Sequence, residues 1–262
     1  MKATQVDAVE RITELLTRFS LSTAAPELAQ RLETAGHRDA LQLLLEVLEM
    51  EAEAREQRKI ARLRRAAQLP PDKTFESLED HALPSPLMRK LRDLARGEFL
   101  EQAENGLFFG LPGVGKSHAA CAIGHALIEQ GHSVLFRPAY QLVQELLAAK
   151  RDLLLPQKLR RLDSFELLIL DDIGYIKQSA EEAEVLFTLI AERYERGSML
   201  ITSNLVFSDW ERIFKEPMAT AAAIDRLVHH AMILEFNVPS YRTRKRRRAD
   251  TDQGGCAAAG GA

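Results

Sequence analysis

The sequence predicts an α/β protein, with a five-stranded parallel sheet between helices after a small all-helical N-terminal domain. Three observations predict this fold class. The octapeptide GLPGVGKS at residues 110–117 fits the pattern G-x-x-x-x-G-K-[ST] of a phosphate-binding loop. From Gly106 onward, short apolar runs alternate with helical patterns, as a parallel sheet with crossover helices requires. The first ~70 residues instead repeat apolar side chains at helical spacing.

Three helices are expected in the N-terminal region. The segment DAVERITELLTRF (7–19) has its apolar residues at helical spacing. A second helix is expected from Pro26, because proline is favoured in the first turn, to Gly36. A long third helix is expected from Arg38 to Leu69, where the two prolines of LPPDK end it. These features predict a helical domain over 1–69, followed by a linker and lead-in helix over 70–105.

The sequence from Gly106 onward predicts the strands and helices of the sheet domain and a C-terminal tail. Strands are expected at 106–110, 133–139, 165–172, 198–204 and 231–236. Several are continuous apolar runs, which is typical of strands buried on both faces. Helices are expected at 118–131, 140–150 and 181–196. We therefore expect a core over 106–245 and a disordered tail over 246–262, which lacks core-forming residues.

Composition excludes several classes of protein. The chain has 262 residues and a formal net charge of −3, so its total charge does not indicate a nucleic-acid partner. No apolar run approaches the ~20 residues that cross a membrane, and the N-terminus lacks the apolar segment of a signal peptide. Cys121 and Cys256 are the only cysteines, too few for a disulfide scaffold or a four-ligand zinc site. A cytoplasmic location without a membrane partner is expected.

The octapeptide has the residues that bind a nucleotide triphosphate. Glycines allow the backbone N–H groups to point inward as a nest for phosphate oxygens at a helix N-terminus. Lys116 would contact the β- and γ-phosphates, and the Ser117 hydroxyl would ligate Mg²⁺. A strand entering the loop and a helix leaving it disfavour the alternative, a glycine-rich turn that binds nothing. The residues expected to contact the nucleotide are Gly110, Leu111, Pro112, Gly113, Val114, Gly115, Lys116, Ser117 and His118.

Two carboxylates lie at the C-terminal end of the third predicted strand (165–172), in LLILDD (167–172). In open α/β sheets the carboxyl ends of the strands are where ligands bind. Asp171 is therefore a candidate to hold Mg²⁺ opposite Ser117, and Asp172 to orient and polarise an attacking water. A helix cap or a turn is the alternative explanation of this pair.

Polar and basic residues later in the chain are further candidates. ITSN (201–204) ends the fourth predicted strand, so Asn204, or its neighbour Ser203, would reach the γ-phosphate or the water. A turn asparagine is the alternative. Arg226 and Arg242 flank the last predicted strand, and either could meet charge on the γ-phosphate in cis or in trans. A solvated surface arginine is the alternative in both cases.

Basic residues are concentrated in two segments, 55–65 and 242–248 (RTRKRRR). The first contains a single acid, Glu56. This pattern favours contact with DNA phosphates, although a solvated helix face is an open alternative. Whether the second segment touches DNA is left open. The candidate DNA-binding residues are Arg55, Arg58, Lys59, Arg62, Arg64 and Arg65.

Together these motifs resemble the AAA+ ATPases. The closer resemblance is to the IstB-like group, the ATP-binding helper proteins of bacterial insertion sequences, which are similar to the DnaC-type helicase loaders. It covers about residues 5–245. It rests on GLPGVGKSH, LLILDDIGY, LFTLIAERYERGSMLITSNLVFSDW, DRLVHHA and PSYRTR.

The resemblance implies an ATPase that uses ATP and Mg²⁺ and whose sites are shared between subunits. The implied roles are phosphate binding by Lys116, Mg²⁺ binding by Ser117 and Asp171, water activation by Asp172, a polar sensor at Asn204, a finger in the neighbour's site at Arg226 and a second sensor at Arg242. The chain has Asp-Asp where many AAA+ proteins have Asp-Glu, so slow or DNA-stimulated hydrolysis is expected. Little chain is left for a C-terminal lid domain.

These implications favour one function over two others. We expect an ATPase that oligomerises on duplex DNA with little sequence preference and assists a transposase. The alternative is a helicase loader of the same fold, which would capture a hexameric helicase and prefer single-stranded DNA. A small-molecule kinase would need an acceptor pocket and an arginine-bearing lid, and the sequence indicates neither.

Overall fold

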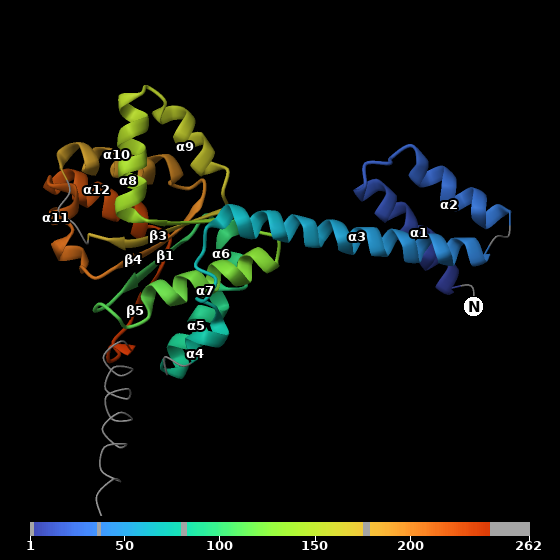
Figure 1. The fold of residues 1–262 in the computed structure, drawn as a ribbon, viewed down its shortest axis with the longest axis horizontal. Helices are drawn as coiled ribbons and strands as arrows, with labels where there is room; N and C mark the ends of the chain where they lie inside the picture. Colours follow the sequence, from blue (N-terminus) through green and yellow to red (C-terminus); the bar gives the residue numbers. More distant parts are fainter. Residues whose placement is uncertain (1–2, 36–37, 80–82, 175–178, 242–262) are drawn as a thin grey trace, which may run out of the picture. The chain divides into compact units, whose positions relative to one another are not determined.

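The computed structural model describes residues 3–35, 38–79, 83–174 and 179–241 (Figure 1). The chain divides into two compact units, Met1–Arg62 and Leu63–Ala262. The division lies within one long helix, α3 (Arg38–Ala67). The domain limits predicted at 69/70 and 105/106 stay predictions.

The first unit is helical. It contains α1 (Ala3–Arg18), α2 (Ala24–Thr34) and most of α3. The apolar residues that recur at helical spacing form its core, in which Ile12, Leu16, Ala25 and Leu41 are buried. Arg18 and Glu56 form an ion pair of 3.0 Å between α1 and α3.

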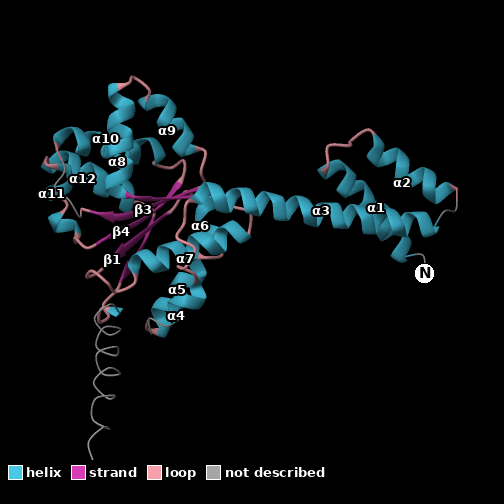
Figure 2. Cartoon of the chain, in the orientation of Figure 1, coloured by secondary structure: helices cyan, strands magenta, loops and turns pink. Residues whose placement is uncertain are grey.

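The second unit is built on a five-stranded sheet of order β2-β3-β4-β1-β5, in which every pair of neighbours is parallel. Figure 2 distinguishes these strands from the surrounding helices. All residues of β1 and β4 are buried, which is typical of strands covered on both faces. The predicted fold class is confirmed. The strands are β1 (Asn105–Phe109), β2 (Val134–Pro138), β3 (Leu167–Ile173), β4 (Ser198–Ser203) and β5 (Ala231–Glu235).

Helices cover both faces of the sheet (Figure 1). On one face α7 (Lys116–Glu129) packs so closely on β3 that a Cβ atom on Gly124 would lie 2.9 Å from Ile169 Cδ1. Buried residues of α8 (Ala139–Arg151), α10 (Ala180–Arg193) and α12 (Pro217–Val228) form the core on the other face. Burial raises the pKa of the Cys121 thiol on α7 to about 12, so this side chain packs as a neutral group.

The segment 70–105, where one lead-in helix was expected, contains three helices: α4 (Phe75–Glu79), α5 (Ser85–Leu94) and α6 (Glu98–Glu101). Four later elements were not predicted: α9 (Leu155–Asp163), the 3₁₀ turn η1 (Phe207–Asp209), α11 (Glu211–Phe214) and α12. Elements of three to five residues, such as α4, α6, η1 and α11, are too short to show a helical period.

The helix predicted over 181–196 ends earlier, at Arg193. The side chain of this residue is buried and bonds to backbone carbonyl groups outside the helix. The Arg193 guanidinium donates hydrogen bonds to the carbonyl oxygens of Leu162 (2.9 Å) and Ser198 (3.0 Å). Burial lowers its pKa to about 10, so it remains charged at neutral pH. Glu195 then adopts a left-handed φ of 57°, which turns the chain into β4.

The helices among residues 3–35, 38–79, 83–174 and 179–241 include none that is long and apolar enough to cross a membrane. The expected tail (246–262) and the basic segment 242–248 lie outside the described residues.

Candidate nucleotide site

The loop between β1 and α7 has the backbone that its glycines were expected to supply. Gly115 precedes the first residue of α7 with φ 105°, a conformation that side chains disfavour. Gly110 has φ 152°, and a Cβ atom there would lie 2.8 Å from the carbonyl oxygen of Phe236. Both positions therefore require glycine, and the loop opens directly onto the N-terminus of a helix.

This helix terminus is suited to an anion. The first turn of α7 contains no acidic residue, so its positive end is not neutralised from within the helix. The buried Lys116 ammonium donates to the carbonyl oxygens of Gly110 (2.7 Å) and Leu111 (3.0 Å), which holds it inside the loop. The glycine cradle and this lysine fit the phosphates of ATP.

The other predicted loop residues differ in their surroundings. Val114 is buried and supports the loop by packing, whereas Leu111 and Pro112 are exposed. The His118 ring contacts the lead-in segment, with Nε2 at 2.8 Å from Ser77 Oγ and 3.0 Å from the carbonyl oxygen of Thr74. Because that carbonyl oxygen only accepts, Nε2 carries the proton. His118 thus ties the segment before the sheet to α7.

Asp171 and Asp172 lie on a β-bulge at the carboxyl end of β3. Leu170 pairs with Ile201 and Ile173 with Ser203, so two residues of β3 stand opposite one residue of β4. Asp172 has a left-handed φ of 63°. Bulges of this kind redirect side chains and are frequent beside active sites.

The residue opposite the bulge is Thr202, which the sequence analysis did not single out. Its hydroxyl donates to Asp171 Oδ1 at 2.7 Å and accepts from the backbone N–H of Asp172 at 2.8 Å. One buried hydroxyl therefore fixes both the orientation of the first carboxylate and the backbone of the second. In the sequence, only the place of Thr202 within ITSN (201–204) pointed to this residue. Its hydrogen-bond partners depend on the register between β3 and β4, which the sequence does not show.

Replacing Thr202 by valine is expected to lower the rate of the predicted ATP hydrolysis roughly tenfold while changing ATP affinity only a few-fold. The methyl group leaves a part-buried carboxylate oxygen and a backbone N–H without this partner, at a cost of about 1–3 kcal/mol in the free energy of unfolding. The turnover number, the ATP dissociation constant and thermal unfolding would be measured together.

Thr202→Ser restores the hydroxyl and should recover most of the turnover lost in Thr202→Val. Thr188→Val, which removes a threonine hydroxyl bonded to a backbone carbonyl within α10, is the matched control. Equal turnover in Thr202→Val and the unmodified protein would show that this hydroxyl does not position the carboxylates.

The two polar residues at the end of β4 have different surroundings. Ser203 is buried, and its hydroxyl lies within hydrogen-bond distance of the carbonyl oxygens of Ile173 (3.1 Å) and Leu205 (3.0 Å), so it serves the turn. Asn204 is half-buried, and its Oδ1 atom is buried with no hydrogen-bond partner among the described residues. An amide oxygen without a partner at this edge of the sheet is suited to accept a hydrogen bond from a water or to contact a phosphate-bound ion.

Arg226 lies away from the phosphate loop of its own chain. It is in the last turn of α12, donates to the carbonyl oxygen of Ala222 (3.0 Å) and lies 5.3 Å from the ring centroid of Phe187. The chain then enters β5, which runs parallel to β1. The end of α12 is therefore near the amino ends of the strands, whereas the loop follows the carboxyl end of β1.

The chain after β5 returns to the loop. The backbone N–H of Tyr241 donates to the carbonyl oxygen of Gly113 at 2.9 Å. Arg242, the predicted second sensor, lies outside the described residues, and its role stays a prediction.

The predicted DNA-binding residues lie on α3, several of them beside acids. Glu51 forms ion pairs with Arg55 (2.7 Å) and Arg58 (3.2 Å), and Arg64 pairs with Glu129 (2.5 Å). The hydrogen bond from Arg55 lowers the pKa of Glu51 despite the opposing effect of desolvation. Lys59, Arg62 and Arg65 are exposed on the same helix. The positive charge of this segment is thus partly neutralised. The acids Glu51 and Glu129 lie outside 55–65, so the sequence of that segment alone did not indicate these pairs.

Comparisons with known proteins agree with this arrangement. The family described as IstB-like ATP binding protein matches residues 13–249. A Sinorhizobium fredii protein whose provisional name is insertion sequence ATP-binding protein is 44% identical over 236 residues, which cover 90% of this chain and 79% of the relative. A Geobacillus stearothermophilus protein with a similar provisional name, from the insertion sequence IS5376, is 35% identical, with 93% and 98% covered.

Solved structures show the same fold at low identity. DnaI has a TM-score of 0.54 at 21% identity, covering 64% of this chain and 95% of DnaI. AMPPCP-bound DnaA from Aquifex aeolicus has a TM-score of 0.53 at 17% identity, covering 71% of this chain and 56% of DnaA. With the family match over most of its length and a phosphate loop followed by a carboxylate pair, the chain belongs to the IstB-like ATP-binding proteins of the AAA+ fold.

Proposed function

We propose that this protein is an ATP-dependent helper of insertion-sequence transposition that assembles on duplex DNA and engages a transposase. Its ATP hydrolysis would set when the assembly dissociates. The observation that carries the proposal is the sheet edge at which the phosphate loop and the Asp171–Thr202–Asp172 bulge lie, in a chain of this family.

The residues at that edge divide the chemistry of hydrolysis. The loop amides and Lys116 bind and orient the phosphates. Ser117 and Asp171 would hold Mg²⁺, which neutralises phosphate charge when bound. Thr202 orients the Asp171 carboxylate through its 2.7 Å hydrogen bond. Asp172 accepts a proton from, or orients, the attacking water, and Asn204 holds that water through its amide.

The site is completed by a second copy of the chain. Arg226 is near the amino ends of the strands and so cannot serve the loop beyond the carboxyl end of β1 in its own chain. A head-to-tail neighbour would bring its own Arg226 against the γ-phosphate. ATP would then join subunits, and its hydrolysis would loosen them.

Exposed basic residues of α3 supply the affinity for DNA. Contacts to phosphates give affinity without base specificity, since phosphates are the same at every base pair. The basic residues of this segment are exposed, but Arg55 and Arg58 must exchange Glu51 for phosphate, and Lys59 must exchange Glu56. We therefore expect weak sequence preference and a moderate number of phosphate contacts.

A triple variant, Arg58→Gln with Lys59→Gln and Arg62→Gln, is expected to bind duplex DNA at least tenfold more weakly at about 0.1 M salt. Each lost contact should reduce the slope of log affinity against log salt by roughly 0.9. Fluorescence anisotropy with duplexes of unrelated sequence measures both quantities.

The control replaces Arg89, Lys90 and Arg92 on α5, which removes the same charges from another exposed helix. An equal loss in the control, or an unchanged salt slope in the α3 variant, would count against α3 as the DNA contact.

The likeness in fold to the DnaC helicase loader, with a TM-score of 0.50 at 19% identity, keeps a helicase loader as the second candidate function. Pull-down by the immobilised protein separates the two. Capture of an insertion-sequence transposase supports the helper, whereas capture of a replicative helicase together with preference for single-stranded DNA supports the loader.

A further inference from the structure

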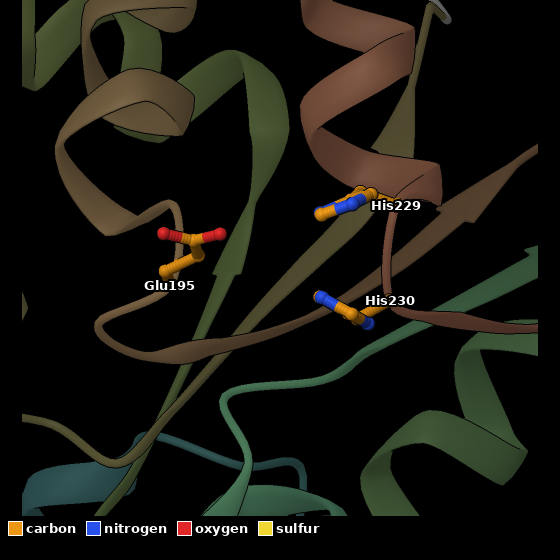
Figure 3. A group of neighbouring side chains, drawn as sticks. All are labelled: Glu195, His229 and His230. Atoms are coloured by element: carbon orange, nitrogen blue, oxygen red, sulfur yellow. The ribbon is translucent and has the colours of Figure 1, made fainter.

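Three metal-ligating side chains converge at a place that the nucleotide site does not use. Glu195 precedes β4, and His229 and His230 precede β5; their ligand atoms all lie within 4.8 Å of one another. Figure 3 shows the carboxylate on one side and the two imidazoles facing it on the other. The ring centroids of the two histidines are 4.1 Å apart. All three residues are exposed and belong to the edge opposite the phosphate loop.

A tyrosine holds one of these groups. The Tyr194 hydroxyl lies 2.9 Å from His229 Nδ1. When His229 Nδ1 donates this hydrogen bond, the lone pair of the ring is on Nε2, which is the arrangement of a metal-binding imidazole whose other nitrogen is held by a second group.

The two loops are already fixed relative to each other by Asn105, the first residue of β1. Its backbone N–H donates to the carbonyl oxygen of His230 at 2.7 Å, and its Nδ2 donates to that of Leu227 at 3.1 Å. Its Oδ1 accepts from the N–H of Met199 at 2.9 Å. The ligands therefore stand on a backbone that three hydrogen bonds hold in place.

We propose that Glu195, His229 and His230 bind one Zn²⁺, or a first-row transition ion of similar chemistry, independently of ATP. Two imidazoles and a carboxylate are a recognised donor set for Zn²⁺, with water in the remaining position. Imidazole is a poor ligand for Mg²⁺, so the ion of the nucleotide site does not compete. The bound ion would join the loops before β4 and β5 on either side of β1.

Isothermal titration of the chelator-treated full chain with Zn²⁺, in excess Mg²⁺ and without nucleotide, tests the proposal. One ion per chain should bind, and Glu195→Gln or His230→Ala should weaken binding at least tenfold. Tyr194→Phe should weaken it by about tenfold, because removing a group that hydrogen-bonds to a metal-ligating histidine has an effect of this size. Titration with Co²⁺ should give visible absorption bands that Glu195→Gln reduces.

His132→Ala is the matched control, because His132 also faces a carboxylate, Glu166 at 2.8 Å, but without a second histidine. It should bind Zn²⁺ as the unmodified chain does. Circular dichroism verifies that each variant is folded. Undiminished Zn²⁺ binding by folded Glu195→Gln and His230→Ala, or dissociation constants above about 1 mM for the unmodified chain, would overturn the proposal.

Discussion

Lys116→Ala is expected to weaken ATP binding at least 100-fold, equivalent to about 2.7 kcal/mol at 25 °C. The ammonium is buried in the loop and is held 2.7 Å from the carbonyl oxygen of Gly110, where it can turn from carbonyl oxygens to phosphates. Alanine removes the only side-chain cation of the loop 110–117. Titration with a fluorescent ATP analogue measures the change.

Lys150→Ala is the control for this variant, because Lys150 is a surface lysine that pairs with Glu184 on α10. It should leave ATP affinity within about twofold, as surface ion pairs contribute little. Thermal unfolding of both variants establishes that they are folded. ATP binding by a folded Lys116→Ala protein at near-normal affinity would mean that the loop is not the phosphate site.

Arg226→Ala is expected to leave ATP affinity within about twofold but to reduce hydrolysis on the order of 10³-fold. Within the described part of its own chain, this arginine contacts α12 through the carbonyl oxygen of Ala222 and α10 through the ring of Phe187. In the proposed head-to-tail assembly, the substitution would therefore remove a cation from a neighbour's site rather than from the loop of the same chain. Steady-state hydrolysis with saturating ATP and duplex DNA measures the effect.

Arg212→Ala provides the comparison, since Arg212 is an exposed arginine on α11 that pairs with Asp209. Its hydrolysis rate should be unchanged. A parallel loss of ATP affinity in Arg226→Ala would place the arginine in its own chain's site. A rate equal to that of Arg212→Ala would show that Arg226 has no part in the reaction.

The strands and the phosphate loop could be predicted because their signals are local. A buried parallel strand needs an unbroken apolar run, as in Leu167–Leu170, and the loop needs glycines at fixed spacing. The short helices α4 and α6 gave no such signal because four or five residues do not complete a period.

Features that depend on tertiary pairing could not be predicted. Thr202 is important because a bulge sets it opposite Asp171 and Asp172, and that register is decided between two strands far apart in the sequence. Likewise, Glu195 meets His229 only because β4 and β5 lie on either side of β1. The early end of α10 depends on Arg193, which finds its carbonyl partners in other segments.

The most direct test of an ATP site completed by a neighbouring subunit is a mixture of Arg226→Ala and Asp172→Ala proteins. Each alone should be inactive, because one lacks the finger and the other the water-activating carboxylate. In an equal mixture, about one quarter of head-to-tail interfaces would pair an intact carboxylate with an intact arginine. DNA-stimulated hydrolysis should therefore return to about a quarter of the unmodified rate. Activity that stays at the level of the separate variants would contradict a shared site.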